Sequence, residues 1–110
     1  MKRARTYSRY ASEASRLLGA QIRAARRERE WSAADLAERV GVSPFTLRKV
    51  EKGDMTVGLG VALEAAALVG VPLFYEDEAL VRLDADRTQA RAALLPQRAA
   101  RPAGDVDDAF

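Results

Sequence analysis

Apolar residues recur at intervals of three and four along most of the chain, which is the spacing that one face of an α-helix requires. The segment from Ser32 to Gly53 shows this spacing twice, with polar residues between the apolar ones. Its regularly spaced apolar residues are Leu36, Ala37, Val40, Leu47 and Val50. The segment therefore predicts two short helices, each with one apolar face, around which the rest of the fold is organised.

Capping residues mark the starts of both short helices. Ser32 followed by Asp35 has the form of a capping box, in which each side chain satisfies a backbone amide of the other residue. Ser43 precedes Pro44, so an N-cap stands before a proline at the first helical position, where the missing N–H costs nothing. Gly53 then closes the second helix.

Small and branched residues at the junction predict that the two helices cross at a steep angle. Ala37 is small where the helices approach, and Gly41 supplies the positive φ that a three-residue turn needs. The side chains expected to seat the second helix on the first are Val42, Leu47 and Val50. This combination predicts a helix-turn-helix. The alternative is an ordinary helical hairpin that binds no ligand.

A longer helix is predicted before this pair, over residues 12–29. Leu18, Ile22 and Ala25 recur on its inner face. Trp31 is expected to pack as the hydrophobic residue at the corner that leads into the next helix. The outer face of the first helix carries Arg16, Arg23, Arg27 and Arg29.

Two more helices are predicted after the pair, over residues 59–69 and 76–95. The second of them either continues throughout or breaks near Asp84, and residues 71–77 have the only strand-like composition in the chain. Gly70 is expected to end the first of them. The residues expected to face inward from that helix are Leu59, Ala62, Leu63 and Ala66.

Composition divides the chain into three parts. Residues 1–11 are basic and predict a flexible arm, which either follows a nucleic-acid backbone or has no role. Residues 12–95 hold the predicted helices and form one domain, which contains the helix-turn-helix. Residues 96–110 contain two prolines, a glycine and mixed charges, and predict an extended tail.

The chain lacks both cysteine and histidine. No disulfide or thiolate metal site is therefore expected, and the usual general base and the commonest metal ligand are missing. We predict a protein that is not an enzyme and that uses no cofactor and no metal. We see no signal peptide and no membrane span, which predicts a cytoplasmic protein without a membrane partner.

Charge is unevenly distributed although the net charge is only +2. Residues 1–53 carry 13 Lys and Arg against 6 Asp and Glu, a net charge of +7, whereas residues 54–110 carry 5 against 10, a net charge of −5. The basic half contains the predicted helix-turn-helix. Because phosphate neutralisation supplies most sequence-independent affinity for DNA, this segregation predicts a double-stranded DNA partner.

The helix-turn-helix resembles the lambda-repressor-like (Cro/C1, or Xre-type) DNA-binding family. The family pattern of alanine, glycine, branched aliphatic residues and Glu-x-Gly is matched by Ala37, Gly41, Leu47, Val50 and Glu51-Lys52-Gly53. The resemblance implies an all-α, lambda-repressor-like domain of about five helices, followed by the extended tail. It also implies that Arg26 pairs, partly buried, with Glu51; the alternative is that Arg26 is one more solvated arginine.

The second short helix is the expected recognition helix, because an α-helix fits the major groove and its N-terminal residues reach base edges. The resemblance implies that Pro44, Phe45 and Lys49 face bases and that Ser43 and Thr46 meet phosphates. Phe45 is expected to contact a thymine methyl, with partial burial or a wedge between bases as alternatives. The remaining outward residues are Arg48 and Lys52.

The start of the first short helix is a further candidate phosphate site. Ser32, together with the free N–H groups of that helix, is expected to bind a phosphate. The family often has a glutamine where Ala33 stands, so one contact that the resemblance would imply is missing here.

A single domain that reads a few base pairs binds weakly, so we expect a homodimer on a palindromic operator, with half-sites about one helical turn apart. Two surfaces are candidates for the dimer contact. Residues 71–75 could pair through strands or apolar packing, and the helix over residues 76–95 is the other candidate.

A narrower resemblance covers most of the chain. The run at residues 53–74, the LLPQR segment at 94–98 and the terminal DVDDAF at 105–110 resemble HipB-like antitoxins. The resemblance implies an antitoxin that neutralises a HipA-like serine/threonine kinase toxin and represses its own operon. Two alternatives stay open: a free-standing Xre-type regulator, and a protein-interaction module that does not touch DNA.

Overall fold

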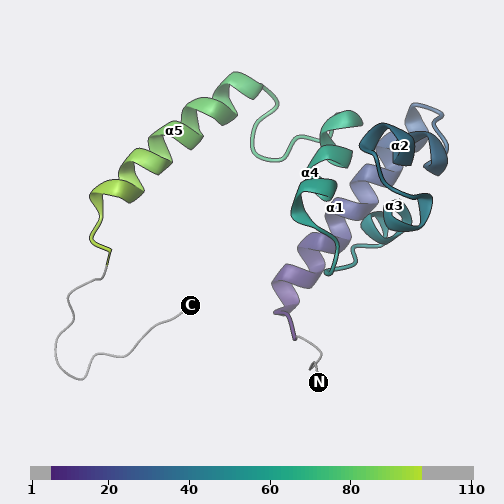
Figure 1. Ribbon diagram of the computed structural model, residues 1–110, viewed down its shortest axis with the longest axis horizontal. Coiled ribbons are helices and arrows are strands. Elements are labelled where there is room, and N and C mark those ends of the chain that lie inside the picture. The colour runs from purple at the N-terminus through teal and green to yellow at the C-terminus, as the bar shows by residue number, and fades with distance from the viewer. Residues whose placement is uncertain (1–5, 98–110) are drawn as a thin grey trace. The chain divides into compact units, whose positions relative to one another are not determined.

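Every regular element among the described residues, 6–97, is an α-helix in the computed structural model. The helices are α1 (Arg9–Glu28), α2 (Ala33–Val40), α3 (Pro44–Glu51), α4 (Leu59–Leu68) and α5 (Glu78–Leu94) (Figure 1). The all-α fold class and the expected five helices are thereby confirmed. In this part of the chain, no helix is long and apolar enough to cross a membrane.

The chain divides into two compact units, Met1–Phe74 and Tyr75–Phe110. The first unit holds α1 to α4: α3 and α4 pack against α1, and α2 packs against α3 and α4 (Figure 1). The second unit holds α5. Most of the predicted arm (residues 1–5) and most of the predicted tail (residues 98–110) lie outside the described residues.

Several helix boundaries differ from those predicted. Helix α1 begins at Arg9 rather than at residue 12, because the Ser8 hydroxyl accepts a hydrogen bond from the Ala11 amide at 3.1 Å and caps the helix there. Helix α5 passes through Asp84 without a break. Residues 71–77 form no strand: Pro72 lacks an amide for pairing, and the described residues contain no neighbouring strand.

The core of the first unit lies where α1 to α4 meet. Ala65 and Val69 are buried there, whereas Leu59, predicted to face inward, is 74% exposed and Leu63 is 37% exposed. Of the other two residues predicted to face inward, Ala66 is buried and Ala62 packs against the core. The pattern misplaced part of this face because α4 carries apolar residues nearly all round, so its periodicity does not select one side. The buried core residues are Ile22, Leu36, Ala37, Leu47, Val50, Ala65, Ala66 and Val69.

Helices α1 and α3 cross in direct backbone contact at Gly19. A Cβ atom on Gly19 would lie 2.5 Å from the carbonyl oxygen of Val50 and 2.6 Å from that of Glu51. One turn earlier in α1, the Ser15 hydroxyl donates a hydrogen bond of 3.0 Å to the Gly53 carbonyl. These contacts hold the C-terminal end of α3 against α1.

The turn between α2 and α3 has the predicted conformation. Gly41 adopts a φ of 90°, and the amides of Gly41 and Val42 both donate to the Ala37 carbonyl, at 2.8 and 3.0 Å. Ala37 is only 1% exposed, so α3 approaches α2 where its side chain is small. The turn therefore sets the direction of α3 as it leaves α2.

The end of α1 is closed by a residue in the left-handed region. Glu30 has a φ of 60°, and the Trp31 amide donates to the Arg26 carbonyl at 3.2 Å, as in a Schellman motif. Trp31 packs against the core, and the guanidinium of Arg39 lies 4.1 Å from the centroid of its ring. Trp31 thus occupies the predicted corner between α1 and α2.

Replacing Glu30 with glycine is expected to raise the free energy of unfolding by about 0.5–1 kcal/mol, because glycine adopts a positive φ without the steric cost that glutamate has there. Glu28→Gly is the matched control. It changes an exposed residue in the last turn of α1, and it should lower the free energy of unfolding by a similar amount. Urea denaturation of the two variants measures both effects, and equal destabilisation by both would contradict the account of this helix end.

Candidate nucleic-acid interface

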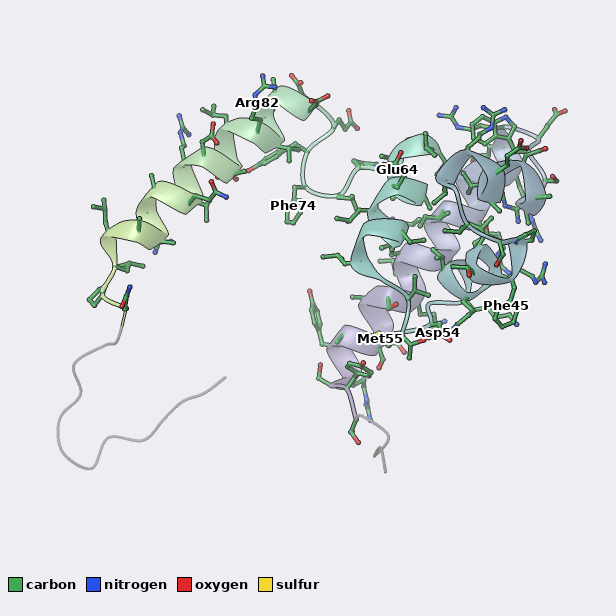
Figure 2. All side chains as sticks on the ribbon, viewed as in Figure 1. Phe45, Asp54, Met55, Glu64, Phe74 and Arg82 are labelled. Carbon is green, nitrogen blue, oxygen red and sulfur yellow. The ribbon has the colours of Figure 1, made fainter. Side chains whose placement is uncertain are left out.

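Helix α3 presents one buried and one exposed face. Leu47 and Val50 are buried against the core, with exposed fractions of 0% and 5%. On the opposite side, the side chain of Phe45 is 64% exposed and lies at the outer edge of α3 (Figure 2). The other predicted contact residues of this segment are exposed or half-buried: Ser43, Pro44, Thr46, Arg48, Lys49 and Lys52.

Phe45 and Lys49 form a pair on the exposed face of α3. The ammonium nitrogen of Lys49 lies 5.7 Å from the centroid of the Phe45 ring, as expected for residues four apart on a helix. This distance is within the range of a cation–π interaction. The exposed face of α3 therefore offers an apolar ring and a positive charge side by side.

The hydroxyl groups of Ser43 and Thr46 have different roles. The Ser43 oxygen accepts a hydrogen bond from the Thr46 amide, and the Ser43 hydroxyl donates to the Thr46 oxygen, both at 3.1 Å. Ser43 is thus occupied as the N-cap of α3. The Thr46 hydroxyl keeps its own hydrogen available, so Thr46 is the better placed of the two to donate to a phosphate.

The capping box at the start of α2 is complete. The Ser32 amide donates to the Asp35 carboxylate at 2.9 Å, and the Asp35 amide donates to the Ser32 hydroxyl oxygen at 3.0 Å. The backbone hydrogen bond from Ser32, and next the side-chain one, lower the pKa of Asp35 below its ordinary value. The donors that remain for a phosphate at this helix start are the Ser32 hydroxyl and the amides of Ala33 and Ala34.

Arg26 and Glu51 are joined by a two-point ion pair beneath this surface. The Nε atom of Arg26 donates to Oε2 of Glu51 at 2.7 Å, and Nη2 donates to Oε1 at 3.0 Å. Each residue is only 7% exposed, and the remaining guanidinium nitrogen donates to the Trp31 carbonyl at 2.9 Å. The hydrogen bond from Arg26 to Glu51 is the main cause of the raised pKa of Arg26.

A recess of about 180 Å³ opens directly over this ion pair, between α1, α3 and the start of α2. We call it the basic recess. It is lined by Arg23, Arg26, Arg27, Ala33, Arg48, Glu51 and Lys52. Because Arg26 and Glu51 neutralise each other, the recess carries four further positive charges. Among the described residues, none of those four basic side chains forms an ion pair.

Other arginines of the first unit do have partners. Arg16 pairs with Glu13 at 2.6 Å, Arg29 donates to the Val69 carbonyl at 3.3 Å, and Arg39 stacks on Trp31. The first of these contacts neutralises a charge, whereas the other two hold the side chain and leave its charge in place. The recess differs because it brings together four basic side chains that form no ion pair within the described residues. Such a cluster attracts a polyanion, and phosphate groups are anions that arginine can bind through two parallel hydrogen bonds.

The inclusion of Arg23 and Arg27 in the same recess as Arg48 and Lys52 was not predicted. The sequence placed the first two only on the outer face of their helix. Their spacing of four residues was the available signal, because it puts both on one side of α1. The crossing angle of α1 and α3 decides which residues of α3 lie near these two arginines. Sequence spacing does not give that angle.

The described residues contain no group of three or more acidic side chains that could hold a metal ion. A protein-family model described as a helix-turn-helix domain matches residues 17–83, which include most of α1, all of α2 to α4 and the start of α5. Comparison with curated proteins and with solved structures gave no match.

Arg26→Met is expected to lower the free energy of unfolding by about 3–5 kcal/mol, because it leaves the Glu51 carboxylate buried without a partner. The double variant Arg26→Met/Glu51→Met removes both charges and should recover most of this loss. Arg16→Met, which breaks an exposed ion pair, is the matched control and should have little effect. Urea denaturation measures all three; a double variant no more stable than the single one would contradict a buried-charge penalty.

Proposed function

The chain belongs to the helix-turn-helix domain family, and we propose that it is a sequence-specific transcriptional repressor that binds double-stranded DNA. In this proposal the chain acts by binding alone, without catalysis and without a cofactor. A cytoplasmic location, where the operator would be, is part of the same proposal.

The observation that carries the proposal is the basic recess beside the exposed face of α3. Four basic side chains that have no acidic partner within residues 6–97 line it: Arg23, Arg27, Arg48 and Lys52. Their mutual repulsion is unfavourable in the free protein, and it is relieved when phosphates approach and release their counterions. A surface that only keeps the protein soluble would be expected to mix the two signs of charge.

Phosphate contacts position a protein on DNA, whereas contacts to base edges give sequence preference. We assign Arg48 and Lys52 to phosphates, together with the Thr46 hydroxyl and the start of α2 at Ser32. Base reading belongs to the exposed face of α3. There Lys49 donates to the acceptor atoms of guanine, and the exposed ring of Phe45 packs against a thymine methyl group.

A homodimer on a palindromic operator completes the proposal. One recognition helix of eight residues contacts only a few base pairs, which gives too little specificity for a single operator in a genome. Two copies related by a two-fold axis read two half-sites. Because binding of the first copy holds the second near its half-site, the dimer binds the operator more tightly than one copy does.

Lys49→Ala is expected to weaken operator binding by about 1–3 kcal/mol and to relax the preference at one base pair. Arg48→Ala is the matched control, since it removes a neighbouring charge of α3 that faces phosphates. It should weaken all sequences similarly, and it should lower the slope of log affinity against log salt by about 0.9 for each phosphate that is no longer neutralised.

Titration of both variants against single-base operator variants, at several salt concentrations, separates the two roles. Equal losses on every sequence for Lys49→Ala would contradict base reading by Lys49. Binding of the unaltered chain that does not decline with salt would contradict the proposal as a whole, and would favour a protein-interaction module instead.

We propose further that the chain is a HipB-type antitoxin, which neutralises a HipA-like serine/threonine kinase toxin and represses the operon that encodes both. The support is the resemblance of residues 53–74, 94–98 and 105–110 to such antitoxins. The last of these segments is acidic and ends in Phe110, a composition suited to a basic protein surface. The alternative is a free-standing Xre-type regulator without a toxin partner.

Co-expression with the product of an adjoining kinase-type gene tests the antitoxin proposal. We expect the two proteins to co-purify, the kinase activity to fall and the operator affinity of the complex to rise. Deletion of residues 105–110 is expected to weaken the complex while leaving DNA binding by the chain alone unchanged, because those residues lie outside α1 to α4. Operator binding without any effect on the kinase would favour the free-standing regulator.

A further inference from the structure

Helix α5 exposes apolar side chains that nothing in the described part of its own unit covers. It is the only helix in that part of the unit, and none of its residues is buried. Leu80, Leu83 and Leu94 are 47%, 45% and 85% exposed. Exposed leucines that gather on one helix face usually mark a contact surface, whereas scattered ones carry no such meaning.

The three leucines do lie on one face. Positions 80, 83, 87, 90 and 94 are separated by three, four, three and four residues, which is the repeat that lets one helix pack along another. We call this the leucine face; its residues are Leu80, Leu83, Arg87, Ala90 and Leu94. The opposite side of α5 carries Val81, Ala85, Thr88 and Ala92, which bring much less apolar surface.

Arg87 is the one charged residue on the leucine face, and it lies between Leu83 and Ala90 near the middle of that face. The Tyr75 hydroxyl donates to the Asp84 carboxylate at 2.6 Å, and this hydrogen bond is the main cause of the raised pKa of Tyr75. The charge of Arg87 opposes that rise. An arginine side chain is long enough to keep its charge in water while its stem covers apolar surface.

Charge is segregated along α5. Its N-terminal half carries Glu78, Asp84 and Asp86 against a single arginine, whereas its C-terminal half carries Arg87 and Arg91 and no acidic residue. A parallel, in-register pair of such helices would bring like charges together at both ends. An antiparallel pair brings each acidic half against a basic half, so α5 is complementary to a second copy of itself.

We propose that α5 is the dimerisation helix and that it packs antiparallel against α5 of a second copy through the leucine face. In this arrangement Leu83 lies opposite Leu94 of the second copy, and Asp84 flanks the second copy's Arg91. The inference deepens the homodimer of the proposed repressor and in that respect rests on the proposed function. Because the interface is isologous, every contact occurs twice.

Cysteine cross-linking of the full-length chain tests the pairing, since the chain has no cysteine of its own. We would mix Leu83→Cys with Leu94→Cys under oxidising conditions and without DNA. The antiparallel pairing predicts that the mixed 83–94 disulfide exceeds the 83–83 and 94–94 disulfides by about fivefold or more, because only that pair comes within disulfide range. An excess of 83–83 disulfide would overturn the antiparallel arrangement.

Sedimentation equilibrium supplies a second measurement that does not depend on cysteine chemistry. Leu83→Ala is expected to raise the dimer dissociation constant by about tenfold or more, since the truncated side chain meets its partner twice in the dimer. Val81→Ala is the matched control, because it removes apolar atoms from the opposite side of α5, and it should leave the constant unchanged. A chain that is monomeric throughout, or equal effects of the two variants, would overturn the proposal.

Failure of the α5 pairing and failure of the proposed repressor function give different results in these experiments. A chain that forms the 83–94 disulfide but binds no DNA would support the pairing of α5 and refute the repressor. A chain that binds operator DNA but shows no self-association would overturn the pairing of α5 and leave DNA binding in place.

Discussion

The candidate nucleic-acid interface depends on the contact between α1 and α3. Gly19 lets the two backbones touch, and the Arg26–Glu51 pair joins the same helices about two turns further along α1. A buried ion pair adds little net stability compared with apolar residues of the same size, but it is satisfied in only one geometry. The pair therefore acts mainly to fix the orientation of α3, and with it the direction in which Phe45 and Lys49 point.

The local features of the fold were predictable because short-range chemistry determines them. Three examples are the capping box at Ser32, the helix start at Pro44 and the positive φ at Gly41. In each case the type of residue strongly favours that one local conformation at that position. The inner face of α4 was not predictable in the same way. A helix that is apolar nearly all round leaves the choice between Leu59 and Val69 to its neighbours in the fold.

In the candidate site too, features within one helix were predictable from the sequence, whereas features that depend on two helices were not. Sequence spacing identified the outward residues of α3, because one helix alone determines which of them share a face. The basic recess required the crossing angle of two helices, so the meeting of Arg23 with Arg48 appeared only in the structure. Resemblance pointed to the Arg26–Glu51 pair, whereas the residues alone left Arg26 as one of several arginines. The strand-like composition of residues 71–77 produced no strand, because composition cannot supply a pairing partner.

Trp31 has a consequence for how this protein can be observed. It is the single tryptophan of the chain, the guanidinium groups of Arg29 and Arg39 lie 5.4 and 4.1 Å from the centroid of its ring, and its carbonyl oxygen accepts a hydrogen bond from Arg26. The indole ring is thus an intrinsic fluorophore at the α1–α2 corner. The backbone of the same residue is joined by one hydrogen bond to Arg26, which lines the basic recess. Its emission reports on that corner without any added label, in a region where ligand phosphates and unfolding would both alter its surroundings.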